Sequence, residues 1–213
     1  LAAARACSFA DGLRAVRLRG ELMAQAGTER PGTMAAILGM DNHTLEALCQ
    51  EATETGEGVV QPANFNSPGQ IVISGDVSAV ARAMALATER GASKVVPLSV
   101  SGAFHSPLMA FAIQGLGKQL QETAFRVPQV PVYLNVTAKP ETKPETIREM
   151  LLAQLTAPVR WAQILENMKA DGFERFVEVG AGNVLSGLVK RTLGRSTTTN
   201  QVGTLDQLTK FLG

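Results

Sequence analysis

The sequence predicts an α/β protein of 213 residues. Two patterns carry this prediction: short apolar strands alternate with helices over residues 34–100, and strands alternate with helices again over residues 130–191. The composition agrees, because 45% of the residues are hydrophobic and a chain of this length can bury a sizeable core. By length, the chain is either one domain or a domain that carries an insert.

A first helix is expected from the segment Ser8-Phe9-Ala10-Asp11 to about Ala26. The serine and the aspartate three residues later have the spacing of a capping box, in which the acid reaches back to the helix start. At about 100° per residue Arg19 lies on the flank of the apolar stripe, and it is the arginine that we expect to point inward. The stripe, which we expect to be buried, consists of Phe9, Leu13, Val16, Gly20 and Met23.

The segment after the breaker Arg30-Pro31-Gly32 is expected to form a subdomain of its own. Its order, βαββαβ, is that of the ferredoxin-like split unit, and we assign residues 32–103 to it. A turn is expected at Asn66-Ser67-Pro68-Gly69. The expected strands are Met34–Gly39, Val59–Ala63, Gln70–Ser74 and Lys94–Val100, and the expected helices are Thr44–Thr55 and Val77–Arg90.

The remaining residues alternate helices and strands, which favours a mostly parallel sheet. The loop Gly180-Ala181-Gly182 opens the last expected helix, but Leu185 stands where a dinucleotide fingerprint needs its third glycine. An ordinary tight turn is therefore favoured over a phosphate-binding loop. The expected helices are Ser106–Thr123, Glu145–Leu155, Trp161–Lys169 and the one that ends at Arg191, and the expected strands are Val130–Asn135 and Arg175–Val179.

The charge balance gives no sign of a nucleic acid or a membrane as partner, because 20 basic and 19 acidic residues leave a formal charge of +1. Cys7 and Cys49 have neither metal-ligand nor CxxC spacing, and no long apolar span occurs. We therefore expect a reducing, cytoplasmic setting. The chain begins at Leu1 inside an alanine-rich run, and we expect it to be truncated at its N-terminus.

His105 is the candidate catalytic residue. It follows the apolar strand that ends near Val100, and the C-terminal ends of strands are where α/β folds bind ligands. Chemistry alone leaves two interpretations open, a general base and a buried structural histidine. The other histidine, His43, follows Asp41-Asn42 at a helix start, where polar side chains cap or face solvent. No G-x-S-x-G or H-E-x-x-H motif accompanies either histidine.

Six segments together resemble one family, the malonyl-CoA:acyl carrier protein transacylases, which are related to the acyltransferase domains of polyketide synthases. The resemblance implies an α/β-hydrolase-like domain with a parallel sheet, made of residues 1–31 and 104–213 and lacking its N-terminal part, with residues 32–103 inserted. The segments are SFADGLRAVRLRGELM, GTMAAILGM, ANFNSPGQIVISG, VPLSVSGAFHSPLM, QLTAPVRW and FVEVGAGNVLSGLVKR.

The resemblance also implies roles for three residues. His105 matches the family's catalytic histidine, which takes the proton of a serine nucleophile and returns it to the leaving thiol. Arg19 matches the arginine that binds the free carboxylate of the malonyl group, a task that suits a guanidinium fork. Phe104 matches the aromatic residue that accompanies malonyl selection, and its ring would fill the space that an α-methyl branch needs.

Two further positions are implied by the same resemblance. Asn66 matches an asparagine at the mouth between the subdomains that helps to hold the substrate, although Asn-Ser-Pro-Gly is also good turn chemistry and both interpretations stay open. Gln154 matches the position whose main-chain carbonyl holds the histidine ring. The family's serine stands in a G-H-S-x-G-E motif, which we expect upstream of Leu1 together with the residues of the oxyanion hole.

The function implied is transfer of malonyl from coenzyme A to the phosphopantetheine thiol of acyl carrier protein, through an acyl-serine, in fatty-acid biosynthesis. The resemblance implies no metal or redox cofactor, and we expect a monomer. Two alternatives stay open: a non-catalytic fragment or binding module that lacks the nucleophile, and an acyltransferase domain of a polyketide synthase. Acyl carrier protein is acidic, so Lys190, Arg191 and Arg195 are candidate contacts.

Overall fold

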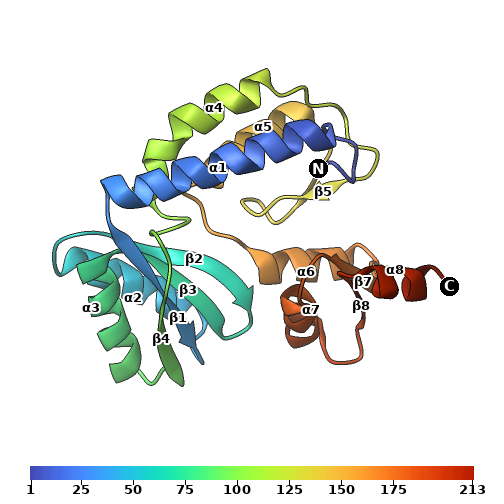
Figure 1. The fold of residues 1–213 in the computed structure, drawn as a ribbon. Coiled ribbons are helices and arrows are strands. Elements are labelled where there is room, and N and C mark those ends of the chain that lie inside the picture. The colour runs from blue at the N-terminus through green and yellow to red at the C-terminus, as the bar shows by residue number, and fades with distance from the viewer.

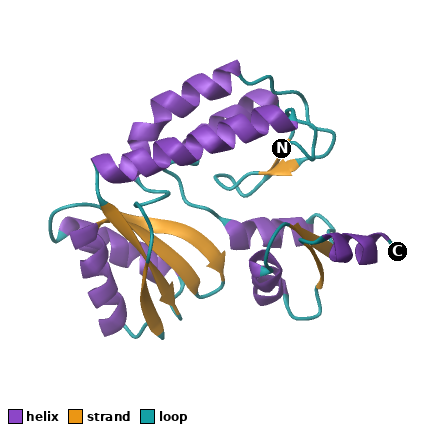
Figure 2. Cartoon of the chain, viewed as in Figure 1, coloured by secondary structure: helices purple, strands orange, loops and turns teal.

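A four-stranded antiparallel sheet occupies the lower left of the structure, a computed structural model that describes residues 1–213 (Figure 1). Its strand order is β2-β3-β1-β4. Most of the strand residues in the chain belong to this sheet, as Figure 2 shows. The strands are β1 (Gly32–Leu38), β2 (Val60–Ser67), β3 (Gln70–Asp76) and β4 (Lys94–Leu98), and the helices between them are α2 (Asn42–Glu54) and α3 (Val77–Glu89).

Both helices pack on the same face of this sheet and bury the largest core cluster. Alternate residues of the strands point to this face, as the two-residue period of a strand requires. The opposite face buries a smaller apolar cluster of Met34, Ala63 and Val72, with Phe104 against it, and turns toward the site described below. The main cluster includes Ile37, Leu45, Leu48, Ile71, Ile73 and Val80.

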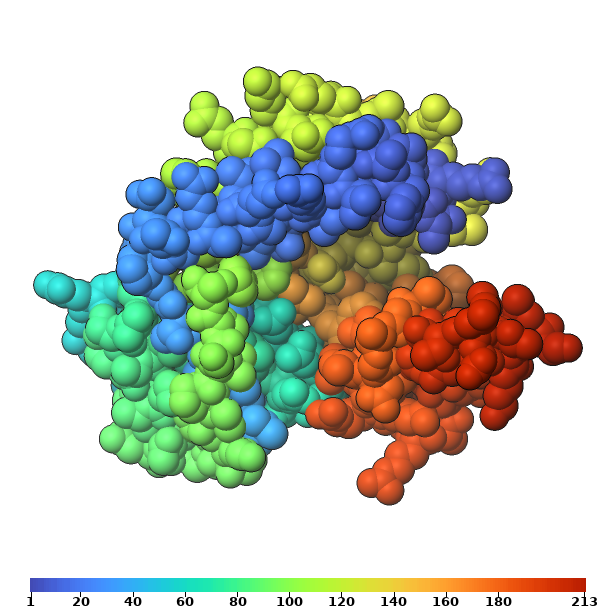
Figure 3. Space-filling view, viewed as in Figure 1, coloured from blue at the N-terminus to red at the C-terminus, as the bar shows by residue number.

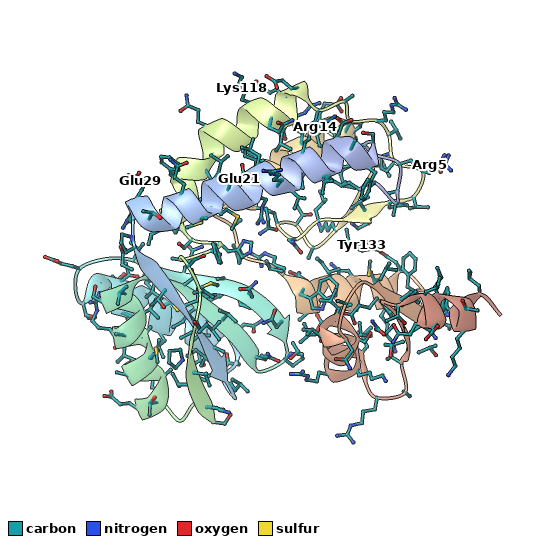
Figure 4. All side chains as sticks on the ribbon, in the orientation of Figure 1. Arg5, Arg14, Glu21, Glu29, Lys118 and Tyr133 are labelled. Atoms are coloured by element: carbon teal, nitrogen blue, oxygen red, sulfur yellow. The ribbon has the colours of Figure 1, made fainter.

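Three helices form a second layer above the sheet (Figure 1). They are α1 (Phe9–Glu29), α4 (Ala112–Glu122) and α5 (Pro144–Ala153), with a short 3₁₀ helix, η1 (Pro107–Phe111), before α4. Although more than 80 residues separate α1 from α4, the two helices share one core cluster, to which Met23, Ala26, Leu116 and Leu120 contribute. Arg14, Glu21 and Lys118 are exposed on the outside of this layer (Figure 4).

The C-terminal residues form a third part, at the lower right of Figure 1. Its two strands pair in parallel, and this is the only parallel strand pair in the structure. A two-stranded antiparallel ribbon, β5 (Val132–Tyr133) with β6 (Pro140–Glu141), lies beside the helical layer. The C-terminal elements are α6 (Trp161–Ala170), β7 (Arg175–Val179), α7 (Val184–Leu193), β8 (Thr198–Val202) and α8 (Leu205–Leu212).

The α/β class is as predicted, and the elements over residues 32–98 follow the predicted order. Strand β2 is longer than expected, because two bulges let it continue to pair with β3 as far as Ser67. The turn is thereby confined to Pro68-Gly69, where Gly69 has φ +69°. The expected strand Val130–Asn135 is only two residues long, and β8 and α8 were not predicted at all.

The expected buried stripe of α1 is wrong at every position except Met23, and Gly20 is exposed as well. Phe9, Leu13 and Val16 are 76%, 56% and 57% exposed, whereas Met23 is buried. The side of the helix that packs on the helical core carries Ala15, Leu22, Met23 and Ala26. Leu22 and Met23 share this side with two alanines, whereas the large apolar side chains earlier in the helix lie on its exposed side. Arg19 is only partly exposed and belongs to this inward side, as predicted.

The helix start also differs in detail from the expected capping box. The hydroxyl oxygen of Ser8 accepts the main-chain N–H of Asp11 at 3.0 Å, as predicted. The carboxylate of Asp11, however, accepts a hydrogen bond from the Ser8 hydroxyl at 2.6 Å rather than from the Ser8 main chain. An aspartate is one methylene shorter than the glutamate that usually completes this motif.

The structure contains no helix with the length and apolar character of a membrane-spanning segment.

Candidate active site

His105 lies in the loop between β4 and η1, and its backbone is left-handed, with φ +57°. This conformation is unfavourable for a residue with a Cβ and is found most often at functional sites. The neighbouring Ser106 is fully buried; its hydroxyl donates to the carbonyl of Ala103 at 2.6 Å and accepts the N–H of Leu108 at 3.3 Å. Ser106 therefore fixes the loop and is not free to act as a nucleophile for its neighbour.

The ring of His105 is oriented by the end of α5. Its Nδ1 lies 3.0 Å from the main-chain oxygen of Gln154, which is the contact that the family resemblance implies. The side-chain amide of Gln154 is also 3.3 Å from Nδ1, but that amide donates to the carbonyl of Ala157 at 2.8 Å. Because a carbonyl can only accept, we assign the proton of the neutral ring to Nδ1. The lone pair of the ring is then on Nε2.

The surroundings keep the His105 ring neutral. Burial lowers the pKa of His105 below its ordinary value of 6.5, and the positive charge of Arg19 lowers it further. The hydrogen bond to Gln154 acts in the opposite direction but is outweighed. A neutral imidazole with a free Nε2 is the form that can accept a proton from a hydroxyl.

Arg19, in the middle of α1, lines a cavity together with His105. Burial lowers the pKa of its guanidinium, and none of the salt bridges in the structure involves it. The neighbouring Arg17, by contrast, is exposed and pairs with Glu21 at 2.9 Å. A buried guanidinium without a carboxylate partner retains its capacity to bind two carboxylate oxygens side by side. Arg19 is thus suited to hold an acidic ligand close to His105.

The cavity that contains Arg19 and His105 has a volume of about 470 Å³. Its polar lining includes Asn135 and Gln154, and most of its remaining wall is apolar. In Figure 3 the surface is recessed between the helical layer and the C-terminal part. The apolar wall is made by Ala15, Val16, Leu116, Leu120, Phe125, Leu151 and Val159, among others.

A second hollow of about 400 Å³ opens on the other side of Arg19 and His105, toward the sheet. Phe104 lines it together with Met34, and the aromatic ring therefore lies next to the two polar groups of the site. Asn64, on β2, also lines this hollow. A bulky ring at this position restricts the space for a branched substituent.

Asn66 lies two residues farther along β2 than Asn64, and it does not line either hollow that contains His105. Both asparagines are half-buried on either side of the buried Phe65, and Asn66 stands at the bulge between Phe65 and Ser67. The polar residues that the sequence interpretation missed are Asn64, Asn135 and Gln61, whose role is described below. The two-residue period of β2 could have indicated Asn64, but nothing local in the sequence marks Asn135.

Two other candidates have structural explanations. His43 is exposed in the first turn of α2, where the Asp41 carboxylate caps the helix by accepting the N–H of Thr44 at 3.0 Å. A polar hollow of about 570 Å³ around His43 is larger than the one at His105, but it holds neither Arg19 nor His105. No group of histidine, cysteine and acidic side chains is arranged to hold a metal ion.

The glycine loop before α7 is not open to an anion. The carboxylate of Glu178 accepts the N–H groups of Leu185 and Ser186 at 3.1 and 2.8 Å. Burial alone would raise the pKa of this carboxyl, but the hydrogen bonds outweigh it and hold the pKa below its usual value. An acid of the chain itself thus occupies the position where a phosphate would bind to a helix start. The tight-turn interpretation of this loop agrees with the structure.

An α/β fold with an oriented neutral histidine and an unpaired arginine at one cavity has the features of an acyl-transferring protein. The sequence pattern of the acyl transferase domain family matches residues 1–210. The chain belongs to this family and, within it, to the malonyl CoA-acyl carrier protein transacylases. It is 42% identical to the transacylase of Haemophilus influenzae over 214 residues. The match spans 100% of this chain and 68% of the relative.

Other relatives give the same result. The malonyl CoA-acyl carrier protein transacylase of Escherichia coli K12 is 46% identical over 191 residues, which are 90% of this chain and 61% of the relative. The chain thus spans about three fifths of that relative's length. This chain also matches the crystal structure of the transacylase from Xanthomonas oryzae, with 42% sequence identity and a TM-score of 0.92. The match spans 100% of this chain and 67% of the Xanthomonas chain.

A further structural match carries a partner. It is a malonyl-transacylase solved in complex with a type II polyketide synthase acyl-carrier protein. This chain is 38% identical to it, with a TM-score of 0.92, over 99% of this chain and 67% of that one.

Proposed function

We propose that this protein transfers a malonyl group from coenzyme A to the phosphopantetheine thiol of acyl carrier protein, through an acyl-serine, in fatty-acid biosynthesis. One observation carries the proposal: Arg19, which has no acidic partner, and His105, whose Nδ1 is held by Gln154, line the same cavity. The first group suits the carboxylate of a malonyl chain, and the second suits the transfer of a proton at its thioester.

In the proposed reaction, Nε2 of His105 takes the proton of a serine hydroxyl as the serine oxygen attacks the thioester carbonyl. The bond between carbon and sulfur breaks, and the imidazolium returns its proton to the thiolate of coenzyme A. In the second half, His105 takes a proton from the phosphopantetheine thiol, whose sulfur attacks the acyl-serine; the ester bond between carbon and oxygen breaks, and the imidazolium returns its proton to the serine oxygen. The neutral ring that burial favours is the form in which each half-reaction begins.

Substrate selection is assigned to three residues. The Arg19 guanidinium binds the free carboxylate of malonyl, and the Phe104 ring excludes an α-methyl branch. Asn66 helps to hold the substrate at the mouth between the subdomains. The position of Arg19 and Phe104 at one hollow with His105 supports the first two assignments, whereas Asn66 rests on the resemblance and on its place beside Asn64.

The serine nucleophile is inferred from the family resemblance alone. Residues 1–213 contain no G-x-S-x-G motif. The proposal therefore requires a G-H-S-x-G motif in the full coding sequence of the gene, which sequencing can establish directly.

The proposed domain organisation is an α/β-hydrolase-like body of residues 1–31 and 104–213 with a ferredoxin-like insert of residues 32–103. The strand order β2-β3-β1-β4 of the antiparallel sheet supports the insert, since it is the order of that unit. The shared core of α1 and α4 supports a body that the insert interrupts. The parallel pairing of β7 with β8 supports a parallel sheet in the body.

The reaction needs no metal or redox cofactor, because proton transfer and nucleophilic attack suffice for it. The partners would be the coenzyme A thioester and acyl carrier protein, for a monomeric, cytoplasmic enzyme. Lys190, Arg191 and Arg195 are proposed to contact the acidic carrier protein. Arg191 donates to the side-chain oxygen of Gln70 at 2.6 Å, which leaves Lys190 and Arg195 as the exposed charges to reverse in a test of this contact.

The test is a transfer assay with the full-length protein, malonyl-CoA and carrier protein bearing phosphopantetheine. Mass spectrometry of the carrier protein should show a malonyl thioester with the wild-type enzyme and none with His105→Ala. A wild-type protein that binds malonyl-CoA but never labels the carrier would point to the binding-module alternative.

A further inference from the structure

The outer edge of β2 holds the loop that follows α5. In the four-stranded sheet, β2 is an edge strand that pairs only with β3, so its other edge can bond to a segment outside the sheet. The main-chain N–H of Phe65 donates to the carbonyl of Val159 at 2.8 Å, and the N–H of Val159 donates to the carbonyl of Ala63 at 2.8 Å. These bonds extend the sheet by a single parallel bridge and fix residues 156–159 beside β2.

Gln61 makes a second connection from the same strand. Its Nε2 donates to the main-chain oxygen of His105 at 2.8 Å and to that of Thr156 at 3.0 Å. The side-chain amide has two hydrogens about 120° apart, so one group can satisfy two carbonyls at once. It joins two segments that lie 44 and 95 residues away in the sequence.

Both segments control the His105 ring. One contains His105 itself, whose left-handed backbone is held in part by its carbonyl. The other begins two residues after Gln154, whose main-chain oxygen binds Nδ1. If the amide of Gln61 is removed, two half-buried carbonyls lose a donor and the two segments are free to separate.

We propose that Gln61 is a positioning residue for His105: it sets the distance between the histidine backbone and the Gln154 carbonyl, and so selects the Nδ1–H tautomer. Its effect on turnover rests on the proposed function, whereas its effect on the tautomer does not. Gln61 does not line either hollow that contains His105 and is not assigned a contact with substrate. The insert would thereby support the catalytic histidine through one side chain.

The tautomer can be measured by ¹⁵N NMR of the imidazole nitrogens in full-length protein without substrate. The His105 signals are identified by their loss in His105→Asn, and the exposed His43 serves as an internal reference. The test variant is Gln61→Met, which keeps the length of the side chain but has no donor. Gln201→Met is the matched control, because Gln201 donates in the same way to the carbonyl of Gly180 at 2.9 Å, away from the site.

The wild type should hold His105 mainly as the Nδ1–H tautomer, and Gln61→Met should shift it toward the Nε2–H form without a change at His43. In the transfer assay, kcat should fall by up to about 100-fold, because misplacement of a catalytic group by about 1 Å can have an effect of this size. The KM for malonyl-CoA should stay unchanged, since Arg19 is untouched. Gln201→Met should behave as the wild type in both experiments.

If Gln61→Met does not fold, Gln61→Asn replaces it, because its shorter amide can reach only one of the two carbonyls and should give a smaller shift in the same direction. An unchanged His105 tautomer together with an unchanged kcat in a folded Gln61 variant would overturn the proposal. So would equal changes at His105 and His43, which would indicate general loosening. A wild type without transfer activity would overturn the proposed function, and the tautomer comparison would still decide the role of Gln61.

Discussion

The Nδ1 atom of His105 lies 3.0 Å from the main-chain oxygen of Gln154. This contact joins a loop after β4 to the end of α5, 49 residues away, and it fixes which ring nitrogen is free. Because the acceptor is a main-chain carbonyl, any residue type at position 154 can provide it. The predictions below follow from this contact and from the residues around it.

Replacement of the two partners should therefore have unequal effects. His105→Ala should lower the rate of acyl transfer by about 10²- to 10⁴-fold, the usual contribution of a general base. Gln154→Ala keeps the carbonyl and loses only the side-chain hydrogen bond to Ala157. It should cost about 1 kcal/mol of stability in a urea titration and leave kcat close to the wild-type value. A Gln154→Ala enzyme as inactive as His105→Ala would contradict the main-chain role.

Arg19→Ala should impair malonyl transfer far more than acetyl transfer, because only malonyl carries a free carboxylate. Removal of one partner of a buried charge pair costs about 2–5 kcal/mol, so kcat/KM for malonyl-CoA should fall by at least about 30-fold. The comparison needs both substrates in the same assay. Arg17→Ala, on the same helix but exposed and paired with Glu21, should change neither activity. Equal losses for the two acyl groups in Arg19→Ala would remove the carboxylate assignment.

Phe104→Ser should allow methylmalonyl to enter. The space of one methyl group provides about 1–3 kcal/mol of discrimination, so the preference for malonyl should drop by about 10- to 200-fold. Competition between the two coenzyme A esters measures this ratio directly. Phe104 also packs against Met34, Ala63 and Val72, so thermal unfolding of the variant should be recorded beside the assay. A variant that is folded and active but equally selective would show that the ring does not act as a steric wall.

The rate should depend on pH through His105. Burial holds its pKa below 6.5, and catalysis requires the neutral ring, so the acid limb of kcat/KM should have its midpoint below pH 6.5. Arg19→Ala, assayed with acetyl-CoA, should move this midpoint upward, because the arginine charge also lowers the pKa. The linked effect on folding has the same sign: stability is greatest above the unfolded-state pKa and decreases as the pH falls below it. A midpoint above pH 6.5 would contradict a buried neutral base.

Some parts of the fold could be predicted from the sequence because their signals are local. The order of the elements between residues 32 and 98 follows from strand and helix periodicity, and the Ser8 cap follows from residue type. The helix α8 carries a local signal that was overlooked, since Thr204 and Gln207 form a complete capping box. The buried face of α1 could not be predicted in this way, because the large apolar residues Phe9, Leu13 and Val16 lie on its exposed side.

The site divides along the same line. His105 and Arg19 are indicated by motif, and the structure places them at one cavity, although the apolar stripe used to orient Arg19 is mostly exposed. Gln61 and Asn135 carry no local signal, because their importance depends on segments far away in the sequence that only the fold brings together. The longer β2 has the same origin: its pairing with β3 and with Val159 extends a strand that its own residues mark only as far as Ala63.

The central claim is that His105 serves a serine that carries the malonyl group. Intact-mass and peptide mass spectrometry of full-length protein, quenched soon after mixing with malonyl-CoA, tests it most directly. We predict a malonyl ester on the serine of a G-H-S-x-G motif in the wild type and its loss in His105→Ala. Transfer to the carrier protein without any acyl-enzyme, or an adduct that forms equally fast in His105→Ala, would contradict the claim.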